Sequence, residues 1–300
     1  MAHVDEEIAS QPACWRRAVE SAPLFEISLP RRGHRVAVVG CGTSWFVAQS
    51  YAVLRELAGH GETDAFAASQ FPAGRRYDRI MAITRSGTTT EVLDLLAALP
   101  RHTPTTVITG VPDAPVAALA TDPVPLPFAD ERSVVQTRFA TTALALLRAS
   151  LGEDLGPAVR DAEDALAAPL PLDPAGTEQV TFIGDGWTVG LANEAALKCR
   201  EAAVFWAESY PAMEYRHGPI AIAAPGRAVW SLGPPPDGLA DQVRETGATF
   251  VHNDRAAAGQ GPRDPLAELV LAQRFAVALA GARGIDPDAP RHLTRSVVLR

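Results

Sequence analysis

The chain has 300 residues, which predicts about two domains and excludes a disordered chain or a miniature disulfide-stapled fold. Its 47% hydrophobic and 21% charged residues are typical of a soluble globular protein. The net charge of −8 disfavours nucleic acid and anionic membranes as partners, because an acidic surface is repelled by phosphate groups.

Three isolated cysteines, with no CxxC spacing, disfavour both a disulfide framework and a zinc site and fit a reducing compartment. No signal segment opens the chain, and no apolar run approaches the ~18 residues that a spanning helix needs. We therefore expect a cytoplasmic protein with no membrane partner and no metal. Lys198 is the single lysine among 27 Lys and Arg residues, which favours the interpretation that this position needs a compact ammonium group.

The first half of the chain alternates strands and helices. We expect strands at 34–40, 79–84 and 104–110, because each is a short run rich in apolar and β-branched residues. Helices are expected at 46–58 and 91–99, each opened by a glycine- and hydroxyl-rich turn. Buried strands that alternate with helices predict a parallel sheet covered on both faces.

A proline-rich stretch at 167–177 then reads as a linker, and the pattern restarts after it. Strands are expected at 180–186, 228–233 and 248–253, with helices at 191–209 and 266–284. The sequence therefore predicts an α/β fold of two similar, doubly wound halves, at 34–166 and 178–282. A helical segment at 1–33 precedes them and a tail at 283–300 follows.

Two loops that follow predicted strands are rich in hydroxyl groups. Ser44 comes after a glycine turn, and the run 84–90 reads Thr-Arg-Ser-Gly-Thr-Thr-Thr. Ligands of open parallel sheets bind beyond the carboxyl ends of the strands, where free helix N–H groups favour anions. These loops suit a phosphomonoester, although the same residues also serve as ordinary helix caps. Neither a Walker motif nor a GxGxxG sequence is present, so a nucleotide enzyme is a weak alternative.

Ionisable groups gather in the second half. Glu194, Lys198 and Glu201 are spaced four and three apart, so they share one face of the predicted helix. A solvated salt-bridge stripe would have the same spacing, but the other faces of this helix are apolar and indicate partial burial. His217 follows at a Gly-Pro corner, where a lone histidine is usually structural.

Taken together, these residues resemble the sugar isomerase (SIS) domain family, and within it the isomerase half of glucosamine-6-phosphate synthase. Five segments carry the resemblance in order: EEIASQP, GCGTS, TRSGTTTEVL, NEAALKCREAAVFWAESYPAMEYRHGP and DAPRHLTRSVVL. The resemblance implies two tandem flavodoxin-like SIS domains, a homodimer with a shared site to which the neighbouring subunit supplies His217, a sugar phosphate as the small-molecule partner, and no cofactor.

The resemblance also implies a role for particular residues. Those matching the phosphate ligands are Ser44, Thr84, Arg85, Ser86 and Thr89. Those matching the sugar contacts are Val134 and Gln136. Glu201 matches the carboxylate that moves a proton between C1 and C2, His217 the histidine that assists ring opening, and Lys198 the lysine beside them.

Three positions depart from the family pattern. Arg85 stands where glutamine is usual, and Gln136 replaces a small hydroxyl residue. Arg295 occupies the place of the catalytic tail lysine that forms an imine, which an arginine cannot do at neutral pH. The 300 residues contain no glutaminase domain, and residue 2 is Ala2 rather than a nucleophilic cysteine.

We therefore expect a phosphosugar isomerase of the aldose–ketose type, acting on a hexose 6-phosphate or on its amino or fructosamine derivative, with net deamination or deglycation left open. The alternative is a non-catalytic phosphosugar-binding regulatory protein, which would need the phosphate loops but no base. The presence of Glu201, Lys198 and His217 favours catalysis.

Overall fold

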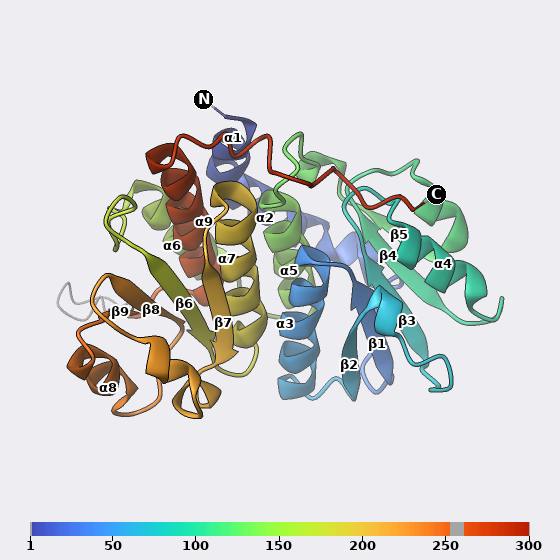
Figure 1. Ribbon diagram of the computed structural model, residues 1–300. Helices are drawn as coiled ribbons and strands as arrows, with labels where there is room; N and C mark the ends of the chain where they lie inside the picture. The colour runs from blue at the N-terminus through green and yellow to red at the C-terminus, as the bar shows by residue number, and fades with distance from the viewer. Residues whose placement is uncertain (1, 253–260, 300) are drawn as a thin grey trace. The chain divides into compact units, whose positions relative to one another are not determined.

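The computed structural model describes residues 2–252 and 261–299, which form two compact units (Figure 1). The five-stranded unit comprises residues 13–155 and 293–299. The four-stranded unit comprises residues 2–12, 156–252 and 261–292. Both are mixed α/β structures built on a parallel sheet.

The five-stranded unit has the strand order β2-β1-β3-β4-β5, which is the flavodoxin-like order. Its strands are β1 Val36–Gly40, β2 Thr63–Ala67, β3 Arg79–Ile83, β4 Thr105–Thr109 and β5 Asp122–Pro125. Every residue of β1, β3 and β4 is buried, because helices cover both faces of the sheet.

The helices of the five-stranded unit are α2 Gln11–Ser21, α3 Thr43–Leu57, α4 Thr90–Ala98 and α5 Arg138–Ser150, with the short 3₁₀ helices η1 Ala22–Phe25, η2 Ala68–Gln70, η3 Pro115–Leu119 and η4 Pro127–Ala129. The first residues of α2 belong to the other unit. Val92 and Leu96 of α4 pack with Ala37, Val39 and Val107 on one face. α3 packs on β1, β2 and α5.

The four-stranded unit repeats this topology, with the order β7-β6-β8-β9. Its strands are β6 Gln179–Gly184, β7 Ala207–Pro211, β8 Arg227–Leu232 and β9 Thr249–His252. Its helices are α1 His3–Ala9, α6 Gly156–Ala167, α7 Thr188–Ala203, α8 Leu239–Glu245 and α9 Pro265–Ala282, with η5 Glu214–Arg216 and η6 Pro219–Ile222. The rings of Phe182, Trp230 and Phe275 join the sheet to α9.

The prediction that no apolar segment is long enough to span a membrane needs correction. Among the described residues, α9 has the length and apolar character of a spanning helix, with mean hydropathy 1.3 over 18 residues. It contains Glu268 and Arg274, packs against α6 and α7, and is 67% buried. These are the features of a core helix in a folded unit.

The predicted helix 191–209 is wrong at its end. α7 stops at Ala203 because Val204 adopts the left-handed conformation, with φ of 50°, and the chain continues into β7. α6 packs on α9, so the proline-rich stretch that follows α6 lies inside the four-stranded unit and leads to β6. It therefore does not separate the two units. Asn253, the last residue of the predicted strand 248–253, lies outside the described residues.

Candidate active site

The connection from β1 to α3 brings Ser44 against the end of its strand. A Cβ atom on Gly40 would lie 2.6 Å from the carbonyl carbon of Ser44, so only glycine allows this approach. Gly42, with φ of 53°, makes the turn and is the N-cap of α3. Ser44 is buried in the first turn of α3, and no side chain caps that helix, so Ser44 is not an ordinary capping residue.

The loop 84–89 joins β3 to α4 beside the β1–α3 connection. β1 leads on to β2 at one side and β3 to β4 at the other, so the two loops flank the point where the strand order reverses. Ligands of doubly wound sheets bind at this switch point. Thr84 and Ser86 are buried, and Thr89 is the N-cap of α4, yet its side chain makes no capping hydrogen bond. The capping explanation therefore does not account for these hydroxyl groups.

Cys41 lies in the connection from β1 to α3 but is not a nucleophile. Burial, with a further contribution from Glu91, raises the pKa of the Cys41 thiol to about 11. The thiol is therefore protonated at neutral pH, and the reactive thiolate form is scarce. The chemistry of this loop rests on its hydroxyl and main-chain N–H groups.

Arg85 is buried, with 2% of its surface exposed, and its two terminal nitrogens donate to main-chain carbonyls. One lies 2.7 Å from the oxygen of Ser133, and the other lies 2.9 Å from the oxygen of Arg295. The guanidinium also lies 3.9 Å from the carboxylate of Glu131. Arg85 therefore connects the hydroxyl loop to two further segments of its unit.

Glu131 organises the segment that carries Val134 and Gln136. Its buried carboxylate accepts hydrogen bonds from the main-chain N–H groups of Thr137, Arg138 and Phe139 at the start of α5. The Oε1 atom of Gln136 is buried and has no hydrogen-bond partner in the described part of the chain. No sequence signal pointed to Glu131, because its partners lie six to eight residues downstream.

In the four-stranded unit, α7 carries the ionisable groups predicted from the sequence. Nζ of Lys198 lies 2.6 Å from Oε2 of Glu201 and 3.3 Å from Oε1 of Glu194. Lys198 and Glu194 are fully buried, whereas the side chain of Glu201 is 20% exposed. Burial alone would lower the pKa of Lys198, but Glu194 and Glu201 outweigh it, and the pKa is raised. Lys198 is therefore an ammonium ion, and Glu201 is the one member of this group open to a reactant.

His217 and Arg295 complete the predicted set. His217 is exposed after η5, and among the described residues it makes no hydrogen bond to Glu201 or Lys198. Arg295 belongs to the five-stranded unit, where its guanidinium binds the Asp130 carboxylate at 2.5 Å and the main-chain oxygen of Glu131. The structure thus groups the hydroxyl loops, the 130–137 segment and the end of the tail, residues 293–299, in one unit. Lys198, Glu201 and His217 belong to the other unit.

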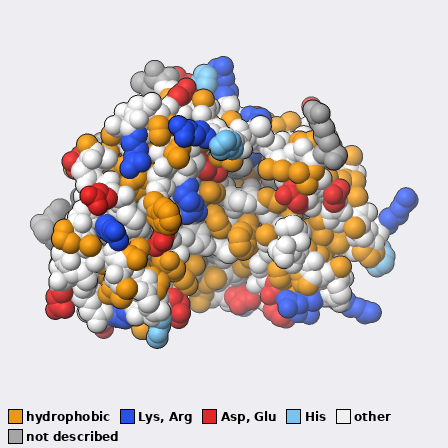
Figure 2. Space-filling model, in the orientation of Figure 1, with side chains coloured by type: hydrophobic (Ala, Val, Ile, Leu, Met, Phe, Trp, Pro, Cys, Tyr) orange, Lys and Arg blue, Asp and Glu red, His pale blue; other side chains and the backbone are white. Residues whose placement is uncertain are grey.

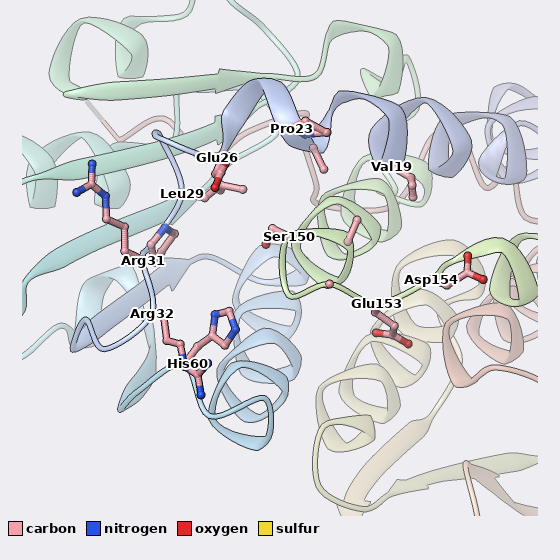
Figure 3. Close-up of a pocket in the computed structure, with 14 residues that line it drawn as sticks. Val19, Pro23, Glu26, Leu29, Arg31, Arg32, His60, Ser150, Glu153 and Asp154 are labelled. Atoms are coloured by element: carbon pink, nitrogen blue, oxygen red, sulfur yellow. The ribbon is translucent and has the colours of Figure 1, made fainter.

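A cavity of about 660 Å³ lies elsewhere in the five-stranded unit (Figure 3). Its lining includes Arg32 and His60 on one side and Glu153 on the other, with Val19 and Pro23 above. It lies at the C-terminal ends of α3 and α5, where cations complement exposed carbonyl groups and anions are disfavoured. None of the predicted site residues lines it.

Acidic and basic side chains are interspersed on the face shown in Figure 2. Among the described residues, no group of three or more His, Cys, Asp or Glu side chains could hold a metal ion.

The chain has an α/β fold of two parallel sheets, with hydroxyl loops at the switch point of the five-stranded sheet, and solved sugar-phosphate enzymes have a similar fold. More particularly, it resembles the isomerase half of glucosamine-6-phosphate synthase, as the sequence predicted. Glutamine–fructose-6-phosphate aminotransferase (isomerizing) of Sulfurisphaera tokodaii is 25% identical over 331 aligned residues. That alignment covers 98% of this chain but 56% of the relative, so the chain spans little more than half of that protein.

Solved structures of sugar-phosphate enzymes have a similar fold. The glucosamine-6-phosphate deaminase of Thermotoga maritima matches with a TM-score of 0.83 and 26% identity, covering 99% of this chain and 100% of that chain. The C-terminal domain of glucosamine-fructose-6-phosphate aminotransferase from Francisella tularensis matches with a TM-score of 0.77 over 97% of this chain and 98% of that one. At 19% identity the second match shows the fold alone. No family model matches the sequence.

Proposed function

We propose that the protein is an aldose–ketose isomerase acting on a hexose 6-phosphate or on its amino or fructosamine derivative, built from two tandem SIS domains. The observation that carries the proposal is the partly exposed Glu201 held 2.6 Å from the fully buried ammonium of Lys198. Such a reaction needs a base that takes a proton from one carbon and returns it to its neighbour. Glu201 is that base, and Lys198 stabilises the negative charge of the enediolate.

The remaining roles follow from the same proposal. Ser44, Ser86 and Thr89, with the N–H groups of their loops, bind the phosphate. His217 assists ring opening, and its exposure fits a residue that one subunit of a cytoplasmic homodimer supplies to the other. When the substrate carries a 2-amino group, isomerisation gives a C2 imine that water hydrolyses to the ketose and ammonia. The deaminase of Thermotoga maritima, similar over the whole chain, supports testing this outcome.

The test is solvent exchange. The protein is incubated in D₂O with a panel of hexose 6-phosphates and amino sugar 6-phosphates, and NMR follows deuterium at C1 and C2 and the release of ammonia. Glu201→Gln keeps the shape but removes the base, so we expect exchange to fall about 10²- to 10⁴-fold while sugar-phosphate binding persists. Binding without exchange in the unaltered protein would favour a regulatory protein, and wild-type exchange by Glu201→Gln would refute the role of Glu201.

A further inference from the structure

Arg85 joins three segments that are far apart in the sequence. It belongs to the hydroxyl loop after β3, one terminal nitrogen holds the oxygen of Ser133, and the other holds the oxygen of Arg295 in the C-terminal tail, residues 293–299. Only 2% of its surface is exposed. A charge buried this deeply is retained only when fixed acceptors surround it.

The tail also contacts the hydroxyl loop directly. The hydroxyl groups of Thr88 and Ser296 are 2.9 Å apart, and Thr88 in turn donates to the Ser86 hydroxyl at 3.0 Å. At the start of α4, the N–H of Thr90 donates to the oxygen of Val297, and the N–H of Leu299 donates to the Thr90 hydroxyl. The tail and the loop therefore share one hydrogen-bond network, in which Arg85 is the only charged side chain of the loop.

The geometry calls for a guanidinium group. Two separate nitrogens of one rigid fork reach two carbonyl groups, and the Glu131 carboxylate at 3.9 Å balances the charge. A glutamine has one amide nitrogen on a shorter side chain, and all the N–H groups of a lysine are on one nitrogen. Neither can hold both carbonyl groups in this arrangement.

We propose that Arg85 is a positioning residue, which fixes the C-terminal tail on the hydroxyl loop, and that it is not a ligand of the phosphate. The tail is then docked before any ligand arrives, and the loop hydroxyl groups are held in place by the protein itself. That these hydroxyl groups bind a phosphate rests on the proposed function, but the docking of the tail does not, so the two can fail separately.

Hydrogen exchange in the ligand-free protein tests the docking. We expect Arg85→Gln to speed exchange at the amides of Thr90 and Leu299 at least about tenfold, because the tail loses a charge-assisted hydrogen bond. Arg101→Gln, which removes an exposed arginine of the same unit, is the matched control and should leave these amides unchanged. Unaltered exchange in Arg85→Gln would overturn the proposal.

Arg85→Lys separates positioning from direct binding. A phosphate ligand needs only a positive charge, so lysine would restore affinity for inorganic phosphate, measured by calorimetry, if Arg85 touched the anion. If Arg85 acts through the tail, lysine should leave Thr90 and Leu299 exchanging as fast as in Arg85→Gln. Restored phosphate affinity with normal tail exchange would show a direct ligand and overturn the proposal.

A shortened chain distinguishes the loss of the tail contact from a general loss of stability. Removing residues 293–300 deletes the tail acceptor, and Arg85→Gln is then made in both the full and the shortened chain. We expect the urea midpoint to fall less in the shortened chain, because one of the two carbonyl partners of Arg85 is already absent. Equal falls in the two chains would show that the tail contact contributes nothing.

Discussion

Nζ of Lys198 lies 2.6 Å from Oε2 of Glu201, the partly exposed member of a carboxylate–ammonium–carboxylate group in which Lys198 and Glu194 are fully buried. Lys198→Met would break this buried ion pair by removing the ammonium beside the fully buried Glu194, so we expect a loss of about 3–5 kcal/mol in the free energy of unfolding. Urea denaturation measures it. Glu201→Gln should cost much less, because Glu194 still pairs with Lys198; equal losses would contradict the arrangement.

The raised pKa of Lys198 predicts that this residue forms no imine. An ammonium ion is not a nucleophile, and the guanidinium of Arg295 is bound to Asp130 and Glu131. Borohydride added with a ketose 6-phosphate should therefore trap no adduct on either residue, as mass spectrometry would show. Arg295→Lys is the positive control, because it restores an amine in the tail. An adduct on Lys198 in the unaltered protein would contradict its electrostatic role.

Val204 ends α7 in a left-handed conformation, which is strained for a β-branched residue. Its side chain is 45% exposed, so little packing is lost on substitution. Asparagine tolerates this conformation, and we expect Val204→Asn to raise the free energy of unfolding by about 1 kcal/mol. Val298→Asn, at an exposed valine without positive φ, is the control. A destabilised Val204→Asn protein would show that the valine side chain matters more than the strain.

Val204 also marks the point at which the helix predicted from the sequence differs from α7. The apolar pattern from Leu191 continues through Phe205 and Trp206, so periodicity alone extends the helix to 209. Nothing in the sequence signals a left-handed valine, because glycine is the usual residue there. Strands β2, β5 and β7 and helix α8 were missed for a related reason: their patterns are short, and tertiary packing stabilises them. Helices α5 and α6, which are 13 and 12 residues long, were also not predicted, although both are long enough to show helical periodicity.

The hydroxyl loops, in contrast, were predictable. A strand, a glycine turn and a helix form a local pattern, and parallel strands place such turns at one edge of the sheet. The partners of Arg85 could not be predicted, because Ser133 and Arg295 are 48 and 210 residues away in the sequence. Their contact depends on the folded unit.

Ser86 provides a direct test of the phosphate loop. Its hydroxyl is buried and accepts hydrogen bonds from the N–H and the hydroxyl of Thr88. We expect Ser86→Ala to weaken sugar-phosphate binding by roughly 1.5–3 kcal/mol, the worth of a hydrogen bond to a charged group, in a calorimetric titration. Ser150→Ala, at the cavity of Figure 3, should leave the affinity unchanged. If the Ser150 variant alone lost affinity, the ligand would bind in that cavity instead.

Gln136 carries a buried Oε1 atom that has no hydrogen-bond partner among the described residues. An unsatisfied carbonyl of this kind costs about 1–3 kcal/mol, so we expect Gln136→Met, which keeps the length, to raise the free energy of unfolding of the ligand-free protein by about 1 kcal/mol. The resemblance implies that Gln136 contacts the sugar, so we expect a sugar hydroxyl group to be the missing partner.

The same substitution should therefore weaken sugar-phosphate binding several-fold while affinity for inorganic phosphate is kept, because the phosphate contacts other residues. Gln179→Met is the matched control: the Gln179 amide donates to the Thr181 hydroxyl at 2.8 Å, so its loss should destabilise the protein without changing either affinity. Opposite signs of the two stability changes, measured by urea denaturation, would show that Gln136 is held unsatisfied for a ligand. If Gln136→Met were destabilised like Gln179→Met and bound the sugar phosphate normally, Gln136 would be a structural residue and the 130–137 segment would not contact the sugar through it.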